Sequence, residues 1–518
     1  MMRLRLLGRW KCSTRQLRCV LWLVSSRRRN WGGVWRFVFS FFSIFFIFKI
    51  SILNPLLRGD GTNFVLLLAG ALLANSERLL RNGLSLTDII KGYELSKDEV
   101  LNNILPKCSL GKINNLLDEK EAAKGIKASL CSKQYGYEDF LSNLIARSCI
   151  STLPEGASPR QFSVDNIRIC KIVGSGVTNS TLVKGMMFKR NIESDIKNVD
   201  NAVIAAFSCP LDNQVTETKG TVLLKNADEL MQFSKGEETM LEQAIASIAA
   251  TGVNVIATGG KVADMALHFC NKYNIMVLRL MSKWDLRRLC STVNAVCLPK
   301  IKSPDKEELG YCQRVYLDSI GEQQVVIFER GTDSSSKSTV LIRGATDNIL
   351  DDIERAVDDG VNNFKVLSKK PDDAQYCAGA GAVEMAIASR LAEFGQKIEG
   401  LEQYAVESFA EAFEQFPRAL AENSGLPAKE VISMLYNVHG EGKPTNQGVD
   451  IESNAANPKL LNAEEAKILE PLETKKWAIK YAVDAALCVL SVDSVIMKKP
   501  AGGPKPRQQK AADWDDED

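Results

Sequence analysis

The chain has 518 residues, more than one ordinary hydrophobic core accommodates, so we expect about two to four domains. Hydrophobic residues make up 45% and charged residues 25%, as in soluble globular proteins. The net charge of +2 is uneven, because residues 1–58 hold twelve Lys/Arg and no acid, which leaves 53 bases and 63 acids in the remainder. This mildly acidic body argues against nucleic acid as a partner.

The cysteine and histidine content excludes several classes of site. Thirteen cysteines form no Cys-x-x-Cys pair, which argues against a zinc site and a disulfide framework and indicates a reducing cytosol. His268 and His439 are the only histidines, too few for a Ser-His-Asp triad or a histidine-based metal site. Any hydrolysis by this chain should therefore depend on carboxylates and a bound metal.

The first 58 residues do not have the pattern of a folded domain. The bases Arg27, Arg28 and Arg29 precede an aromatic, apolar run at 37–48, which continues to residue 57 after Lys49. Residues 34–57 are marginal for a membrane span, and no small-residue cleavage site marks a signal peptide. Three interpretations remain: a membrane anchor, an exon foreign to a soluble protein, or an ordered domain. We interpret residues 1–58 as not part of the fold.

A glycine-rich loop follows at Gly59-Asp60-Gly61-Thr62, directly before a long apolar-periodic run. The pattern predicts a tight loop that leads into a helix N-terminus, where free amides and the helix dipole favour an anion. The glycines allow a close approach to phosphate, Thr62 offers a hydroxyl and Asp60 could hold Mg²⁺. The alternative is a plain turn with a helix cap.

Residues 62–127 are predicted to be helical. Asn82-Gly83 ends the first helix, and Ser85 with Asp88 resembles a capping box at the start of the next. Helical patterning continues through 113–117 and 135–148.

The middle of the chain alternates strands and helices. Ile167–Val173 is a β-like run, and further strands are predicted at 202–207, 253–257, 275–280, 295–298, 325–328 and 340–342. Amphipathic helices are predicted between several of them, at 238–250, 261–272 and 283–291. This alternation indicates an α/β domain with a central sheet.

The last third is again helical. Residues 345–370 form one strongly amphipathic helix with several acids, and further helices are predicted at 382–395, 402–417 (ended by Pro417), 427–437 and 475–490. Residues 501–518 are predicted to be disordered from their composition. Two helical ends around an α/β block suggest one domain built from two distant segments, with the rest inserted.

Several short stretches resemble signatures of the group II chaperonins across residues 59–518. They are Gly59–Thr62, Glu354–Asp359, Gly379–Ala382 and Ala421–Gly425. Other stretches, among them Gly259–His268 and Ser282–Leu289, are similar to one subunit type of the eukaryotic cytosolic chaperonin.

The resemblance implies an α/β multi-domain chaperonin fold. A mostly helical equatorial ATP domain would comprise 59–127 and 377–500, and a hinge-like intermediate domain 128–192 and 340–376. An α/β apical substrate-binding domain with a helical protrusion would comprise 193–339. In such cytoplasmic proteins, paralogous subunits form a double ring of eight-membered rings, and ATP hydrolysis closes a lid over an unfolded protein substrate.

The resemblance also implies the site residues. Asp60 would bind Mg²⁺, while Gly59, Gly61 and Thr62 would line the β- and γ-phosphates of ATP. Asp359 would orient the attacking water, so Asp60 and Asp359 would be the catalytic pair. Gly448 and Glu470 would border the base and ribose, and Gly381 would belong to the glycine-rich turn beneath the nucleotide. An acid on the hinge domain would couple hydrolysis to closure.

One departure from the family pattern leaves the activity open. Members of the family carry a glycine-rich phosphate loop and a second metal-binding acid upstream of the Gly-Asp-Gly-Thr loop, and residues 1–58 contain neither. The chain is therefore either an ATP-driven folding subunit or a non-catalytic or assembly-deficient structural subunit. A membrane-associated variant, anchored through residues 34–57, is the third alternative. No motif identifies the residues that bind unfolded substrate.

Overall fold

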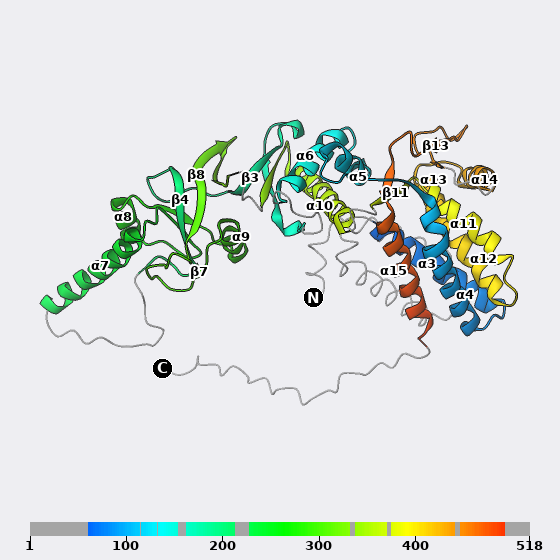
Figure 1. Cartoon of the computed structure of the whole chain (residues 1–518), viewed down its shortest axis with the longest axis horizontal. Helices are drawn as coiled ribbons and strands as arrows, with labels where there is room; N and C mark the ends of the chain where they lie inside the picture. The colour runs from blue at the N-terminus through cyan, green and yellow to red at the C-terminus, as the bar shows by residue number, and fades with distance from the viewer. Residues whose placement is uncertain are drawn as a thin grey trace, which may run out of the picture.

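The computed structural model describes residues 61–113, 115–131, 133–153, 162–212, 227–331, 337–369, 374–440 and 446–492. Three lobes follow one another along the long axis of the molecule (Figure 1). We call them the helical lobe (61–112 and 375–492), the central lobe (113–188 and 337–369) and the sheet lobe (189–331). The predictions for residues 1–58, for the anchor at 34–57, for Gly59 and Asp60 and for the tail at 501–518 lie outside the described residues.

The helical lobe is built from two distant segments that share one core. Helices α3 (Thr62–Arg81) and α4 (Leu86–Glu99) pack with α11 (Ala382–Gly395), α12 (Glu402–Phe413) and α15 (Leu472–Leu490). The buried cluster joins Leu68 and Leu72 to Phe409 and Ala482. By length and composition, α3 is the one helix in the described part of the chain that could cross a membrane. Its apolar side chains are used in this core.

Local sequence signals explain the ends of these helices. Asn82 caps α3, and the Asp88 N–H donates to Ser85 Oγ at 3.2 Å, as the capping box predicts. The predicted helix at 402–417 is wrong: α12 ends at Phe413, and Pro417 lies in the first turn of α13 (Gln415–Asn423). Proline is tolerated there because the first-turn N–H groups have no partner within the helix. Helix α14 (Ala428–His439) follows.

Short strands and turns complete the helical lobe. After α4 the chain passes through a π-helical turn (Val100–Ile104) and a 3₁₀ turn (Leu105–Cys108) into β1 (Ser109–Lys112). Strand β1 pairs with β11 (Gln375–Ala378), which pairs with β14 (Leu469–Pro471), and β12 (Gln447–Val449) pairs with β13 (Leu460–Asn462). The helical pattern predicted for 113–117 is wrong, because β1 leads into a turn there and Ile113 N–H donates to Ala374 O.

The central lobe packs three helices against one end of a sheet. Helices α5 (Glu119–Cys131), α6 (Glu138–Ser151) and α10 (Asp347–Lys369) share a core in which Ile353, Val357 and Phe364 are buried. Strand β2 (Ile167–Val173) has the predicted bounds and pairs in parallel with β10 (Ser338–Gly344). Two 3₁₀ turns flank β2, at Val164–Asn166 and Val177–Asn179.

One strand carries the sheet from the central lobe into the sheet lobe. The first half of β3 (Thr181–Phe188) pairs with β10, and its second half, from Gly185, pairs with β9 (Gln323–Glu329). Gly185 has φ 118°, and a Cβ there would overlap the Phe328 carbonyl. The change of partner therefore requires glycine at this position.

The sheet lobe continues this sheet. From β9 the strand order is β8 (Gly310–Ile320), β4 (Asn198–Phe207), β5 (Val255–Thr258) and β6 (Met276–Arg279), and β7 (Cys297–Leu298) also pairs with β4. Strands β4, β5 and β6 are parallel, and the helices are α7 (Ala227–Ala250), α8 (Asp264–Lys272) and α9 (Lys283–Val293). The α/β alternation is confirmed, whereas the sequence pattern did not indicate β8.

Candidate nucleotide site

Two helices of the helical lobe begin at a glycine in the left-handed conformation. Gly61 (φ 82°) caps α3, and Gly381 (φ 82°) caps α11. Glycine has no side chain that could accept a bond from the first-turn amides. The Ala382 N–H of α11 donates to Gly379 O at 3.1 Å, and the remaining first-turn N–H groups of α3 and α11 can donate to an anion. Thr62 is the first residue of α3 and is half-buried. The predicted loop-to-helix geometry is present in the part of the loop that the structure describes.

The second glycine lies in a turn that the predicted ribose and base residues surround. The Gly379 N–H donates to Ile468 O at 3.0 Å, and the Val449 N–H donates to Ala380 O at 2.9 Å. Ala380 itself has φ 55°, an uncommon conformation for a residue with a Cβ. A Cβ on Gly379 would lie 3.1 Å from Glu470 Oε1. The structure thus brings Gly381, Gly448 and Glu470 together around this turn.

A buried lysine, which sequence reasoning missed, joins the two helix starts. Lys475 Nζ pairs with Glu384, in the first turn of α11, and with Glu470 at 2.7 Å. It also lies 4.6 Å from the ring centre of Phe64, in the first turn of α3. Burial lowers the pKa of Lys475, but the carboxylates of Glu384 and Glu470 outweigh burial and raise it above its ordinary value. Lys475 therefore stays charged, and it contacts the first turn of α11 through Glu384 and the first turn of α3 through Phe64.

The predicted water-positioning acid lies on the central lobe. Asp359 is on α10, its side chain is 12% exposed, and it forms an ion pair with Lys133, which follows α5. Next to it, burial and then the charge of Glu354 raise the pKa of Asp358 to about 6, although its side chain reaches solvent. Among the described residues, no hydrogen bond or ion pair joins Asp359 to the first turn of α3 or α11. The acid and the glycine-rich turns thus belong to different lobes.

The packing around Gly448 leads to a test of the glycine-rich turn. A Cβ at Gly448 would lie 2.6 Å from the Ala380 carbonyl oxygen and 2.7 Å from Ala380 Cβ. We expect Gly448→Ala to displace β12 from the turn, with a cost of about 1–3 kcal/mol in unfolding free energy. Nucleotide affinity, measured by titration calorimetry, should fall with it.

The matched control is Gly111→Ala, because a Cβ at Gly111 meets no atom within 4 Å. This variant should keep its nucleotide affinity. Equal affinity in the wild-type chain and Gly448→Ala would exclude Gly448 from the site.

Comparisons with known proteins point in one direction. The TCP-1/cpn60 chaperonin family profile matches residues 57–500. T-complex protein 1 subunit theta of Mus musculus is 53% identical over 459 residues, which is 89% of this chain and 82% of that protein. The Caenorhabditis elegans protein of the same name is 45% identical over 460 residues, with the same coverage of both.

A solved structure agrees with the sequence comparisons. An open state monomer of a group II chaperonin from Methanococcoides burtonii superimposes with a TM-score of 0.62 and 25% identity. The match covers 84% of this chain and 100% of that one.

Proposed function

The chain belongs to the TCP-1/cpn60 chaperonin family, and we propose that it works as a theta-like subunit whose ATP site is completed only when two lobes meet. Its fold is that of a group II chaperonin, and its role is that of an ATP-binding subunit in a hetero-oligomeric chaperonin that assists protein folding. The observation that supports the split site is the placement of Asp359 on α10 and of Gly61 and Gly381 on the helical lobe.

We assign the equatorial, intermediate and apical domains of a chaperonin to the helical, central and sheet lobes. The eight-membered double ring and the cytoplasmic location are parts of the same proposal. The rings would place paralogous subunits on either side of this one.

The described residues of the helical lobe fit the phosphates of a nucleotide. Two glycine-capped helix starts offer amide donors for phosphate oxygens, and Gly448 lets β12 pack closely against Ala380 of the glycine-rich turn. Asp60 would hold Mg²⁺, and Thr62 would donate its hydroxyl to the phosphates. Mg²⁺, when bound, neutralises phosphate charge.

The central lobe supplies the group that positions water. Asp359 can accept a hydrogen bond from a water molecule and orient it toward the terminal phosphate. In the conformation described here the carboxylate is paired with Lys133, so its charge is already compensated. We infer that turnover requires α10 to approach the glycine-rich turns and Asp359 to leave Lys133, which would make hydrolysis dependent on closure.

Exposed apolar side chains on the sheet lobe give a candidate surface for unfolded protein. Met281 is 62% exposed and Trp284 is 68% exposed, at the start of α9. Such side chains on a solvent face favour contact with apolar segments of another chain. We propose that this surface takes part in substrate binding.

The test of the proposed function uses the full chain with an affinity tag, purified from cells of its own organism. We expect paralogous chaperonin subunits to copurify, and the complex to bind ATP in a saturable titration. A chain that purifies alone and binds no nucleotide would contradict the proposal.

The same preparation separates the alternatives that the sequence left open. A complex that binds ATP at the site of this chain without single-turnover hydrolysis there would identify the non-catalytic structural subunit. Carbonate-resistant membrane association would support the anchored variant, and recovery only in the soluble fraction would exclude it.

A further inference from the structure

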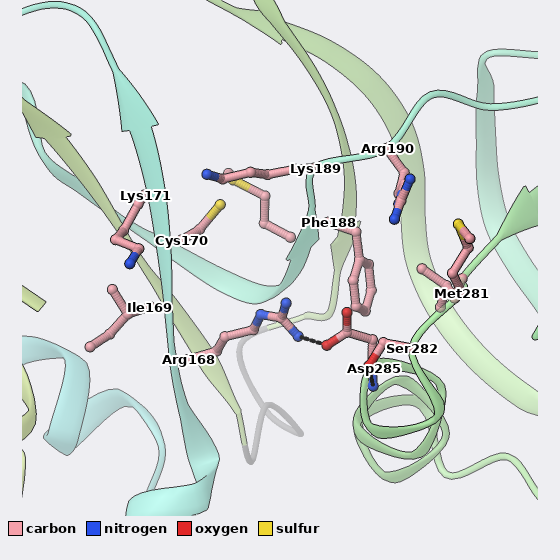
Figure 2. A pocket seen from close by; sticks show the side chains of 12 residues that line it. Arg168, Ile169, Cys170, Lys171, Phe188, Lys189, Arg190, Met281, Ser282 and Asp285 are labelled. Carbon is pink, nitrogen blue, oxygen red and sulfur yellow. Dashed lines mark hydrogen bonds and ion pairs between the residues drawn. The ribbon is translucent and has the colours of Figure 1, made fainter. Parts of the chain in front are cut away.

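A cavity separate from the candidate nucleotide site lies between β2, the end of β3 and the start of α9 (Figure 2). Its volume is about 250 Å³. The charged residues that line it are four cations and one acid, namely Arg168, Lys171, Lys189, Arg190 and Asp285. Such an excess of like charge around one cavity favours an anion within it.

Two of the four cations are already compensated by acids. Arg168 pairs with Asp285 at 2.5 Å, and its guanidinium lies 5.2 Å from the ring centre of Phe188. Lys171 pairs with two acids of α10, Asp351 at 2.7 Å and Glu354 at 2.6 Å. These contacts fix the positions of both side chains.

The other two cations have no such partner. Lys189 and Arg190 follow β3 directly and are exposed, and neither forms an ion pair within the described parts of the chain. Figure 2 shows Arg190 extending toward Phe188 and Met281, while Lys189 lies on the side of Cys170. The cavity therefore has two uncompensated positive charges beside two that are held in place.

Polar groups at the start of α9, on the side of the cavity away from β2, favour an anionic occupant. Ser282 caps α9, an eleven-residue helix, and accepts a bond from the Asp285 N–H at 3.4 Å. The positive end of the α9 dipole thus faces the cavity, together with the Arg168 guanidinium. Asp285 contacts Nη1 of that guanidinium and leaves its other N–H groups for a second acceptor.

We propose that this cavity binds a compact, multiply charged phosphate compound. Arginine is suited to this role because its planar fork of donors matches phosphate oxygens, and lysine adds a point charge. The ligand would contact Arg190 and Lys189 after β3 and approach Arg168, which is tied to α9 through Asp285. A bound polyanion would then restrain α9 relative to β2 and β3.

Inorganic tripolyphosphate is the probe for this site. The purified full-chain complex is titrated by calorimetry in saturating ADP, so that the nucleotide site is filled. The double variant Lys189→Gln/Arg190→Gln should bind the probe at least about tenfold more weakly, since each lost bond between charged groups contributes more than a neutral one. Lys184→Gln removes the same charge from an exposed position of β3 outside the cavity, and should keep the affinity.

Hydrogen exchange locates the bound probe. Tripolyphosphate should slow exchange of the amides at 187–190 and 281–285 in the wild-type chain and in Lys184→Gln, but not in the double variant. No saturable binding in ADP, equal affinity in all three proteins, or protection only at the starts of α3 and α11 would overturn the proposal. Because ADP occupies the nucleotide site throughout, these outcomes are independent of the ATPase assignment.

Discussion

Lys475→Met is expected to destabilise the helical lobe by about 3–5 kcal/mol, which is the usual cost of removing one partner from a buried ion pair. Lys475 is 5% exposed, and its ammonium group is shared by the carboxylates of Glu384 and Glu470. Without it, Glu384 would be a buried charge with no compensation, and the contact with Phe64 would be lost. Thermal unfolding followed by helical circular dichroism measures this effect. Lys475→Met should have a lower unfolding midpoint than the wild-type chain.

Two comparisons make the Lys475 result specific. Lys476→Met changes the neighbouring exposed lysine of α15 and should shift the midpoint little. Glu384→Gln with Lys475→Met removes the buried negative charge as well, and should recover part of the loss. An unfolding midpoint for Lys475→Met within error of Lys476→Met would refute the role assigned to the buried pair.

The pH dependence of this contribution follows from the direction of the pKa shift. Burial lowers the pKa of Lys475 in the folded chain. The carboxylates of Glu384 and Glu470 outweigh burial and raise this pKa above its ordinary value of 10.5. A raised lysine pKa contributes stability that is fully present below 10.5 and is lost as the pH rises above it. The difference in unfolding free energy between the wild-type chain and Lys475→Met should therefore be constant between pH 7 and 9.

Asp359→Asn is expected to reduce ATP turnover by about 10²- to 10⁴-fold, the range typical for loss of a group that positions or activates a nucleophile. An amide keeps the size of the side chain but removes the charge that orients water. Nucleotide affinity should change little, since the glycine-capped starts of α3 and α11 lie on another lobe. Single-turnover hydrolysis and ATP titration on the same complex separate the two effects.

Asp358→Asn is the matched control for Asp359→Asn. Asp358 is the preceding acid of α10, but its side chain is exposed and forms no ion pair among the described residues. Its variant should keep most of the turnover. Turnover by Asp359→Asn equal to that of Asp358→Asn, or affinity lost together with turnover, would show that Asp359 has only a structural role.

The sequence predicted elements well where a single local signal dominates. Ile167–Val173 is a dense β-branched run and became β2 with those bounds. Ser85 and Asp88 marked the start of α4. Strand β8 was missed because Cys312 and Val315 are buried among exposed neighbours without a regular alternation, so no period-2 pattern shows. The apolar residues of the turn after β1 are spaced as on a helix face, so the pattern there predicts a helix where the structure has a turn.

The sequence predicts only those residues of the candidate site that belong to a recognisable motif. Gly381, Gly448 and Glu470 do meet at one turn, although 89 positions separate Gly381 from Glu470. Lys475 and Lys133 could not be found in this way, because each is one lysine among many on an amphipathic segment. Their partners, Glu384, Glu470 and Asp359, come from other elements, and only the packed lobes show these ion pairs. These two lysines are therefore identified by their tertiary contacts and not by a local sequence pattern.

The core shared by α3 and α15 has a consequence for synthesis on the ribosome. Leu68 and Leu72 are made first, but their partners Phe409 and Ala482 follow only after the whole central and sheet lobes have been translated. At about 5–20 residues per second, the apolar face of α3 waits for tens of seconds without its partners. During that interval the nascent helical lobe exposes the kind of surface that folding factors bind. We therefore expect that this chain, whose role is to assist the folding of others, itself needs protection until its last helix emerges.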